Sequence, residues 1–173
     1  IDGIQHSQLL YYQRTDYGVL PVVYGYVAAM VLERRERALH PVPALTESHE
    51  ALYLPLKAFD ADQFAQAGIP VHDSLEAREL EKTSFQTMLV RAAATVARVR
   101  DQLERQLALR WIEQQSPGAP NWLLVDGSIA DLMGALERRQ LVNVVGVSKS
   151  HRTNYLDLNW MLQVLNMPAG WRS

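Results

Sequence analysis

Two aspartates stand in short motifs whose residue types suit metal-assisted hydrolysis. Asp126 follows the apolar run 122–125 and precedes Gly127 and Ser128, and Asp2 is the second residue of the opening segment Ile-Asp-Gly-Ile. Hydrolysis of a phosphodiester concentrates negative charge on the attacking and leaving oxygens. Divalent cations held by Asp and Glu neutralise this charge and lower the pKa of bound water. Carboxylates on separate elements are therefore the ligands that such a site requires.

The element expected before Asp126 places this side chain favourably. The run 122–125 is short, continuous and bounded by turn residues, which predicts a strand covered on both faces in a parallel sheet. Ligands of such sheets bind outside the carboxyl ends of the strands. Gly127 permits a sharp turn, and Ser128 can cap a following helix whose N-terminus offers donors to a phosphate. The alternative is that Asp126 only caps this helix.

A second buried strand is expected at 141–147, followed by a polar and basic cluster. Strand, helix and strand together indicate an α/β unit. Lys149 would contact the scissile phosphate or position the attacking water, and His151 or Arg152 could hold a DNA backbone. The simpler alternatives are a solvated loop position for Lys149 and a surface position for His151.

The first part of the chain predicts strands and then a loop-rich insertion. Residues 1–33 suit a strand, a turn at 16–18 and a longer strand, with Asp2 at the end of the first strand. Scattered prolines predict that 34–74 is a loop-rich insertion. Three arginines at its start form either a DNA-facing patch or a solvated helix end: Arg34, Arg35 and Arg37.

The clearest helical pattern lies in the middle of the chain. Apolar residues recur at helical spacing between 75 and 115 and indicate one long helix, or two with a bend. The segment Ser-Pro-Gly-Ala-Pro at 116–120 ends it, because proline cannot continue the hydrogen-bond ladder. A further helix is expected after Asn154 or Asp157. No second domain is needed, so residues 1–173 are expected to form one α/β domain.

The composition is that of an ordinary globular protein, with 48% hydrophobic and 21% charged residues. The net charge of -2 lacks the basic excess common in nucleic-acid-binding domains, so DNA would need local basic patches. The absence of cysteine leaves only oxygen and imidazole as metal ligands and fits a reducing compartment. No apolar run reaches the roughly 18 to 20 residues of a membrane span. We therefore expect a soluble, cytoplasmic protein.

The order of these motifs resembles the NurA nuclease family. The resemblance rests on Ile-Asp-Gly-Ile at 1–4, the helical run at 100–111, the Asp-Gly-Ser motif after 122–125, and the strand with its basic cluster at 144–156. It implies a ribonuclease H-like mixed sheet with flanking helices. It also implies Mn²⁺- or Mg²⁺-dependent hydrolysis of DNA, as a 5′ to 3′ exonuclease and single-strand endonuclease. The family acts as a homodimer with a hexameric HerA-type ATPase in DNA-end processing.

The same resemblance assigns residues to the site. Asp2 and Asp126 match the two aspartates of the family, and Glu104 is the choice for the glutamate between them, with Glu113 and Glu81 as competitors. Helical geometry leaves this choice open, since Glu81 falls on the apolar stripe of the helix whereas Glu104 and Glu113 fall on its flanks. The expected metal ligands are Asp2, Glu104 and Asp126. Lys149 joins them as a catalytic residue, and the expected contacts to nucleic acid are Ser128, Lys149, His151 and Arg152.

Two departures from the family pattern bear on activity. Ile4 stands where the first motif usually carries a serine hydroxyl. The family also has a further C-terminal stretch with an active-site histidine and aromatic residues, which nothing after Trp171 supplies. The chain is therefore expected to be a fragment that lacks C-terminal elements of the domain.

Two other functions compete with the nuclease. A haloacid dehalogenase-type phosphatase also uses an aspartate at a strand end and a later lysine, but Ser128 stands where that class has its second aspartate. A catalytically inactive ribonuclease H-like module, which docks to an ATPase or mediates dimerisation, is the non-enzymatic alternative.

Overall fold

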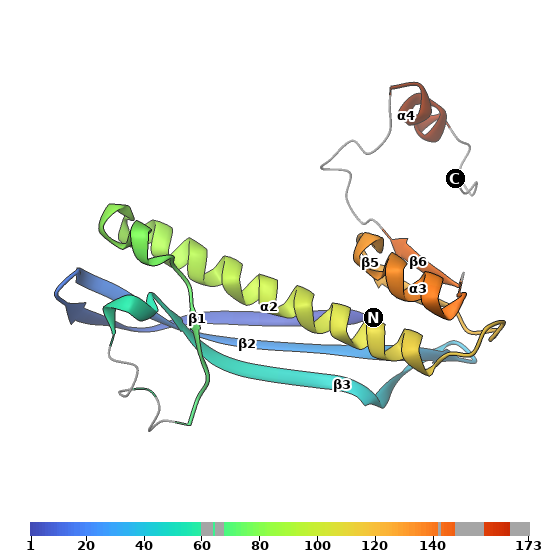
Figure 1. The fold of residues 1–173 in the computed structure, drawn as a ribbon, viewed down its shortest axis with the longest axis horizontal. Helices are drawn as coiled ribbons and strands as arrows, with labels where there is room; N and C mark the ends of the chain where they lie inside the picture. The colour runs from blue at the N-terminus through green and yellow to red at the C-terminus, as the bar shows by residue number, and fades with distance from the viewer. Residues whose placement is uncertain (60–63, 65–67, 142, 148–157, 167–173) are drawn as a thin grey trace.

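Three long strands and one short strand form the larger sheet of the computed structural model, which describes residues 1–59, 64, 68–141, 143–147 and 158–166 (Figure 1). β1 (Asp2–Thr15) pairs antiparallel with β2 (Gly18–Arg35), which pairs antiparallel with β3 (Ala38–Leu54). Gly18, with a φ of 107°, follows the tight turn between the first two strands. The expected strand, turn and longer strand are therefore confirmed. Asp2, however, is the first residue of its strand and not the last.

The prediction of a loop-rich insertion at 34–74 is wrong for most of its length. β3 occupies Ala38–Leu54, a 3₁₀ helix follows at Leu56–Ala58, and β4 (Val71–Asp73) pairs in parallel with the end of β3. The prolines at 41 and 43 misled the prediction. Among the described residues only β2 pairs with this part of β3. Where a proline faces the unpaired edge of β3, its missing backbone N–H therefore costs no hydrogen bond of the sheet.

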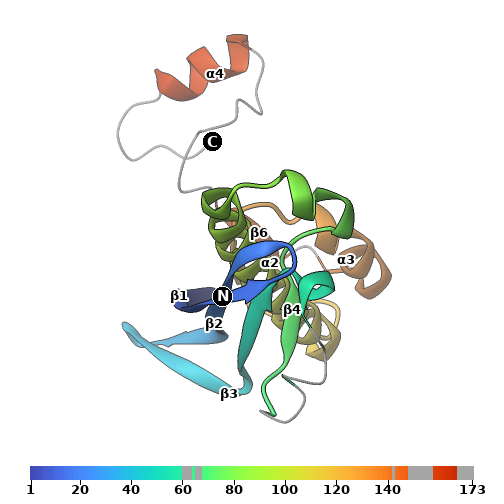
Figure 2. The ribbon, with the colours of Figure 1, turned by 90° about the vertical axis from the view of Figure 1, so that its left-hand side faces the viewer.

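One long helix, α2 (Phe85–Gln114), crosses one face of this sheet (Figures 1 and 2). The side chain of Ser84 caps it by accepting a hydrogen bond of 3.3 Å from the backbone N–H of Thr87. A 3₁₀ helix at Ala77–Lys82 precedes it, so the expected helical region is confirmed with a break before α2. Alternate residues of β2 and β3 face α2 and form the main core with its apolar stripe: Val23, Val27, Ala29, Val31, Ala51 and Tyr53 against Ala92, Val96, Leu103, Leu107 and Trp111.

The expected α/β unit follows α2. β5 (Leu123–Asp126) and β6 (Val144–Val147) pair in parallel, with a 3₁₀ helix at Ala130–Leu132 and α3 (Met133–Arg139) between them. β5 is covered on one face only, which corrects the prediction of a strand buried on both faces. Leu123 and Val125 are buried, whereas the alternating Leu124 and Asp126 are exposed.

The two sheets meet at the beginning of β1. The backbone nitrogen of Ile1 donates a hydrogen bond of 2.9 Å to the carbonyl oxygen of Leu124 in the middle of β5. This contact brings the first strand of the chain beside the strand that ends at Asp126. The fold is thus a mixed α/β arrangement that contains both antiparallel and parallel strand pairs.

A short helix, α4 (Leu158–Leu165), is described near the end of the chain, where a helix was expected. Within the described ranges, no helix combines the length and the apolar character needed to cross a membrane.

Candidate functional site

Asp2 and Asp126 line the same cleft, although 123 residues separate Ile1 from Leu124 in the backbone contact that joins their strands. This cleft has a volume of about 890 Å³ and lies between the start of β1, the β2–β3 hairpin, the end of α2 and β5. Both aspartates are exposed. Asp126 lies at the carboxyl end of β5, as expected, and its neighbour across the parallel pairing is Val147 at the end of β6.

Glu104 reaches the same region from α2. Its carboxylate lies against the backbone of Gly3, so closely that a Cβ atom at position 3 would overlap it. The side chain of Glu104 is 18% exposed. Burial raises its pKa most, Arg100 counteracts this, and the carboxylates of Asp101, Asp126 and Asp2 raise the pKa further. Both aspartates therefore lie close enough to Glu104 to raise the pKa of its carboxyl group.

Arg100 is the member of this cluster that sequence reasoning missed. Its Nε lies 3.5 Å from Oε1 of Glu104, one helical turn later, and its Nη2 donates a hydrogen bond of 2.6 Å to Oδ1 of Asp101. Asp101, Glu104 and Asp126 all raise the pKa of the Arg100 guanidinium, chiefly through the hydrogen bond to Asp101. The spacing of four residues between an arginine and a glutamate on a predicted helix was the signal that could have revealed it.

The chemistry of this donor set fits a hard divalent cation, but the side chains do not converge on one point. No group of three or more His, Cys, Asp or Glu side chains is arranged to hold a metal ion in the described part of the chain. Side chains alternate along a strand, so Gly3 faces Glu104 while Asp2 points to the opposite face of β1. Asp2 and Asp126 line the cleft, whereas Glu104 is not among the residues that line it.

The two competing glutamates lie elsewhere. Glu81 belongs to the 3₁₀ helix before the start of α2, whereas the cleft is lined by residues from the end of α2. Nineteen residues separate Phe85 from Glu104, which at 1.5 Å per residue is roughly 28 Å of helix. Glu113 is exposed in the last turn of α2. Glu104 is therefore the glutamate whose pKa both aspartates influence.

A glycine and a serine side chain shape the turn after Asp126. Gly127 has a φ of 88°, and the Oγ of Ser128 accepts a hydrogen bond of 3.2 Å from the backbone N–H of Ala130. The helical segment begins at Ala130 with Ile129 at the cap position, so the expectation that Ser128 occupies the cap is wrong, although its side chain bonds to the first helical residue. The other expected nucleic-acid contacts lie outside the described residues: Lys149, His151 and Arg152.

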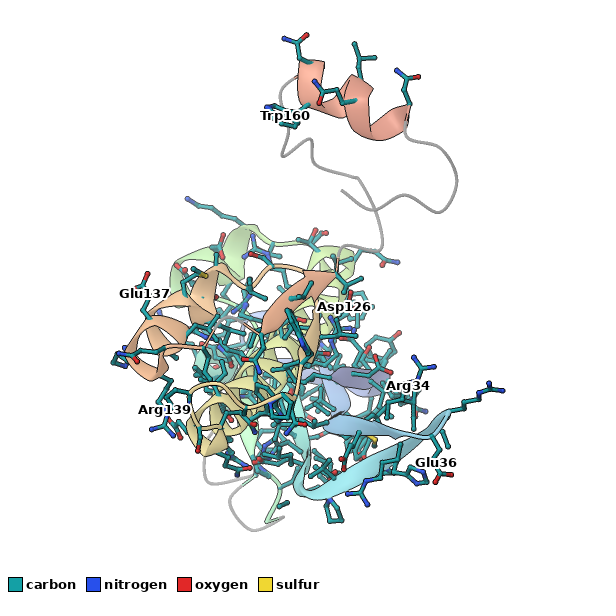
Figure 3. The ribbon with its side chains drawn as sticks, turned by 90° about the vertical axis from the view of Figure 1, so that its right-hand side faces the viewer. Arg34, Glu36, Asp126, Glu137, Arg139 and Trp160 are labelled. Atoms are coloured by element: carbon teal, nitrogen blue, oxygen red, sulfur yellow. The ribbon has the colours of Figure 1, made fainter. Side chains whose placement is uncertain are left out.

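The far wall of the cleft combines a tryptophan and an arginine. Trp122 is 65% exposed immediately before β5, and Arg34 comes from the end of β2. Figure 3 shows Asp126 and Arg34 from the side on which the β2–β3 turn lies. Arg34, Arg35 and Arg37 surround this strand turn, so their interpretation as a helix end is wrong. Arg35 pairs with Glu33 at 2.6 Å, which leaves Arg34 as the arginine that lines the cleft.

A comparison of the chain with protein-family models, with curated protein sequences and with solved structures finds no match in any of the three.

Proposed function

We propose that this chain is a divalent-metal-dependent DNA nuclease with a ribonuclease H-like fold of the NurA type. The order of elements supports this fold: three antiparallel strands, a long helix across one face, and a parallel strand–helix–strand unit beside the first strand. The resemblance of the motifs at Asp2 and Asp126 leads to the same fold class.

One observation carries the proposed chemistry. Asp2, Glu104 and Asp126 come from three separate elements, and the two aspartates act on the pKa of the glutamate. Like charges repel, and a folded chain that gathers carboxylates in this way needs cations to compensate them. Such a set suits Mn²⁺ or Mg²⁺, whose preferred ligands are carboxylate oxygens.

The roles of the individual residues follow from their positions. When bound, the cation would neutralise charge on the phosphate and lower the pKa of a water molecule. Asp2, Glu104 and Asp126 are the residues that would hold it. Ser128 and the turn at Gly127 are proposed to orient the phosphate at the end of β5, and Lys149 is proposed as a further contact to the reacting phosphate.

The cleft is the proposed path of a single DNA strand. Arg34 supplies a charge for a backbone phosphate, and the exposed ring of Trp122 supplies a surface on which a base can stack. Both side chains share the cleft with Asp2 and Asp126, so a bound strand would pass directly by the two aspartates. His151 and Arg152 are proposed to extend the contact with the backbone.

The proposed biological role follows the resemblance. The nuclease would act as a homodimer with a hexameric HerA-type ATPase that moves DNA, and it would process DNA ends, most simply in the cytoplasm. The 5′ to 3′ exonuclease and single-strand endonuclease activities belong to the same proposal.

A cleavage assay tests this proposal. Wild type and Asp126→Asn are each incubated with single-stranded and double-stranded DNA in the presence of Mn²⁺. We expect cleavage by the wild type and a loss of at least about a hundredfold in the variant, because one metal ligand loses its charge. Asp131→Asn is the matched control, since Asp131 is an exposed aspartate five residues later that pairs with Arg105 at 3.8 Å. Equal cleavage by wild type and Asp126→Asn would reject the site.

A docking module without catalytic activity is the second candidate. The observation in its favour is the exposed apolar surface around the cleft, where Trp122, Leu124 and Val147 remain open to solvent, together with the lack of convergence of the described carboxylates. Stable binding to the ATPase with no cleavage in its presence would favour this candidate. Hydrolysis of a small phosphomonoester would point instead to a haloacid dehalogenase-type phosphatase.

A further inference from the structure

The small parallel sheet buries only one of its two faces. Leu123 and Val144 pair across its two strands and belong to the main core, together with residues of α2 and α3. The next pair, Leu124 and Val145, points to the opposite face, where the two side chains are 58% and 38% exposed. Parallel sheets are almost always covered on both faces. Within the described residues, the outer face of β5 and β6 therefore lacks its second layer.

This outer face forms one wall of the cleft. Trp122, Leu124 and Val147 line the cleft from this side, and Leu39 and Val42 line it from the β2–β3 hairpin. Two apolar walls are the arrangement that holds an amphipathic helix by its apolar face. The cleft has a volume of about 890 Å³. Two turns of helix, roughly 10 Å wide and 12 Å long, occupy roughly 900 Å³. The cleft thus has the size of one short helix.

α4 (Leu158–Leu165) has the sequence and the length of such a helix. Leucine or methionine stands at positions 158, 161, 162 and 165, the spacing that places apolar residues on one helix face. Leu162, which belongs to this face, is 47% exposed. Eight residues of helix and four residues of strand both measure roughly 12 to 13 Å, so α4 matches β5 in length. A helix this short is marginal in water by itself and gains its stability from packing.

The chain connects α4 directly to the cleft. Val147, the last residue of β6, lines the cleft, and the ten residues 148–157 join it to the first residue of α4. Ten residues span at most roughly 33 to 36 Å, which is about three times the width of a helix. α4 lies apart from the sheets and from α2 in the structure (Figures 1 and 2). The connection is long enough for α4 to return to the cleft.

We propose that α4 docks in the cleft of its own chain, where its apolar face covers the outer face of β5 and β6. Leu162 then packs on Leu124 and Val147, and the polar positions 159 and 163 remain toward solvent. The docked helix lies beside Asp126, whose partner across the strand pairing is Val147. One consequence rests on the proposed function: α4 and a single DNA strand compete for the cleft, so α4 regulates access to the two aspartates.

Disulfide trapping tests the docking without metal or DNA. The chain contains no cysteine, so an engineered pair has no background. The full chain with Leu124→Cys and Leu162→Cys is oxidised under native conditions, and the disulfide is detected by mass spectrometry of a tryptic digest. Both substituted side chains are exposed, so the fold should tolerate them. We expect an intrachain disulfide in most molecules, because docking brings the two Cα atoms within the roughly 4.4 to 6.8 Å that a disulfide requires.

Val90→Cys combined with Leu162→Cys is the matched control. Val90 is 67% exposed on α2 and is not among the residues that line the cleft. This pair should give a disulfide yield at least about tenfold lower, because the two positions are not brought together. Equal yields in the two pairs would overturn the docking. A disulfide between two chains on a non-reducing gel would place α4 on a second copy and overturn the intrachain assignment.

Binding of a labelled single-stranded oligonucleotide, measured by fluorescence anisotropy in Ca²⁺, tests the competition. Leu162→Asp puts a charge on the apolar face of α4, and Gln163→Asp puts the same charge on the polar side. Burial of an unpaired charge is costly, so Leu162→Asp should keep α4 out of the cleft and bind DNA at least about threefold more tightly than wild type. Gln163→Asp should bind as wild type does. Equal affinities of the two variants contradict the competition.

The docking and the proposed function fail in different ways. A disulfide specific to the Leu124 pair, with no DNA binding by any variant, supports the docking and rejects the nuclease. DNA binding by the wild type, with equal disulfide yields in the two pairs, rejects the docking and leaves the proposed function in place.

Discussion

The carboxylate of Glu104 lies directly on the backbone of Gly3, although 101 positions separate the two residues. This contact joins the middle of α2 to the start of β1, next to Asp2. Only a residue without a Cβ atom permits it, because any side chain at position 3 would occupy the place of the carboxylate. The glycine of the first motif therefore makes room for the glutamate.

Gly3→Ala is expected to destabilise the protein by about 1 kcal/mol, the low end of the cost of an extra methyl group in a packed contact, because the overlapping atoms belong to the flexible side chain of Glu104. Glu104 must turn away from β1, so Mn²⁺ affinity should fall as well. Urea unfolding and calorimetric titration measure the two effects. In the double variant Gly3→Ala/Glu104→Ala the overlap is gone, so the double variant should be more stable than the sum of the two single losses predicts.

Gly134→Ala is the control for this substitution. Gly134 lies in α3, where an added Cβ meets only the far end of Arg138 at 3.6 Å. Alanine is the better helix former, so this variant should gain about 0.5 to 1 kcal/mol. Equal losses in both variants would show that the close contact at Gly3 has no special role.

The free energy of unfolding should depend on pH through the titration of the Glu104 carboxyl group. Its pKa is raised, mainly by burial, so the folded protein holds this proton more tightly than the unfolded chain does. The stability due to this proton is fully present below the unfolded-chain pKa of about 4.3 and is lost as the pH rises through the folded-state pKa. Wild type should therefore lose stability relative to Glu104→Gln as the pH rises above about 4.3.

Urea unfolding at several pH values, without metal, measures this difference. Glu113→Gln serves as the control, because Glu113 is an exposed glutamate near the end of the same helix. A stability difference between wild type and Glu104→Gln that is the same at every pH would contradict the assignment.

The local part of the site follows from local sequence. The apolar run before Asp126, the glycine with positive φ at 127 and the hydroxyl of Ser128 all act within a few residues of one another, so their pattern predicts the strand, the turn and the start of the next helical segment. The exposed outer face of β5 could not be predicted, because it depends on which elements pack over Leu124.

The long-range part of the site depends on packing that no local pattern encodes. The point where α2 crosses β1 decides which residue of the helix contacts Gly3. A shift of the helix by one turn would bring Arg100 to this place instead of Glu104. The strand at Ala38–Leu54 was hidden for a similar reason. Its prolines are typical of loops, and the sequence does not show that they lie in a strand with an unpaired edge, where proline is tolerated.

Addition of Mn²⁺ should stabilise the wild type against unfolding, by about 2.7 kcal/mol at a free concentration one hundred times the dissociation constant. Asp2→Asn and Asp126→Asn should each lose most of this stabilisation, because each removes an anionic ligand from the cleft. Thermal unfolding with and without Mn²⁺ measures it. Asp131→Asn should respond to Mn²⁺ as wild type does; if it also loses the response, the ion binds by general surface charge.

The exposed ring of Trp122 should contribute to the binding of single-stranded DNA. Stacking of a base on an aromatic side chain is worth about 1 to 3 kcal/mol by alanine substitution, so Trp122→Ala should weaken the binding of a short oligonucleotide by about fivefold to 150-fold. Trp122→Phe keeps a stacking surface and should recover most of the affinity. Fluorescence anisotropy with a labelled oligonucleotide, in Ca²⁺ to suppress cleavage, gives the dissociation constants.

Trp160→Ala is the control, because Trp160 is 59% exposed on α4 and is not among the residues that line the cleft. If both alanine variants lose affinity equally, the cleft is not the path of the strand. If only Trp122→Ala does, the base stacks beside the two aspartates, where the phosphate that follows it can reach them.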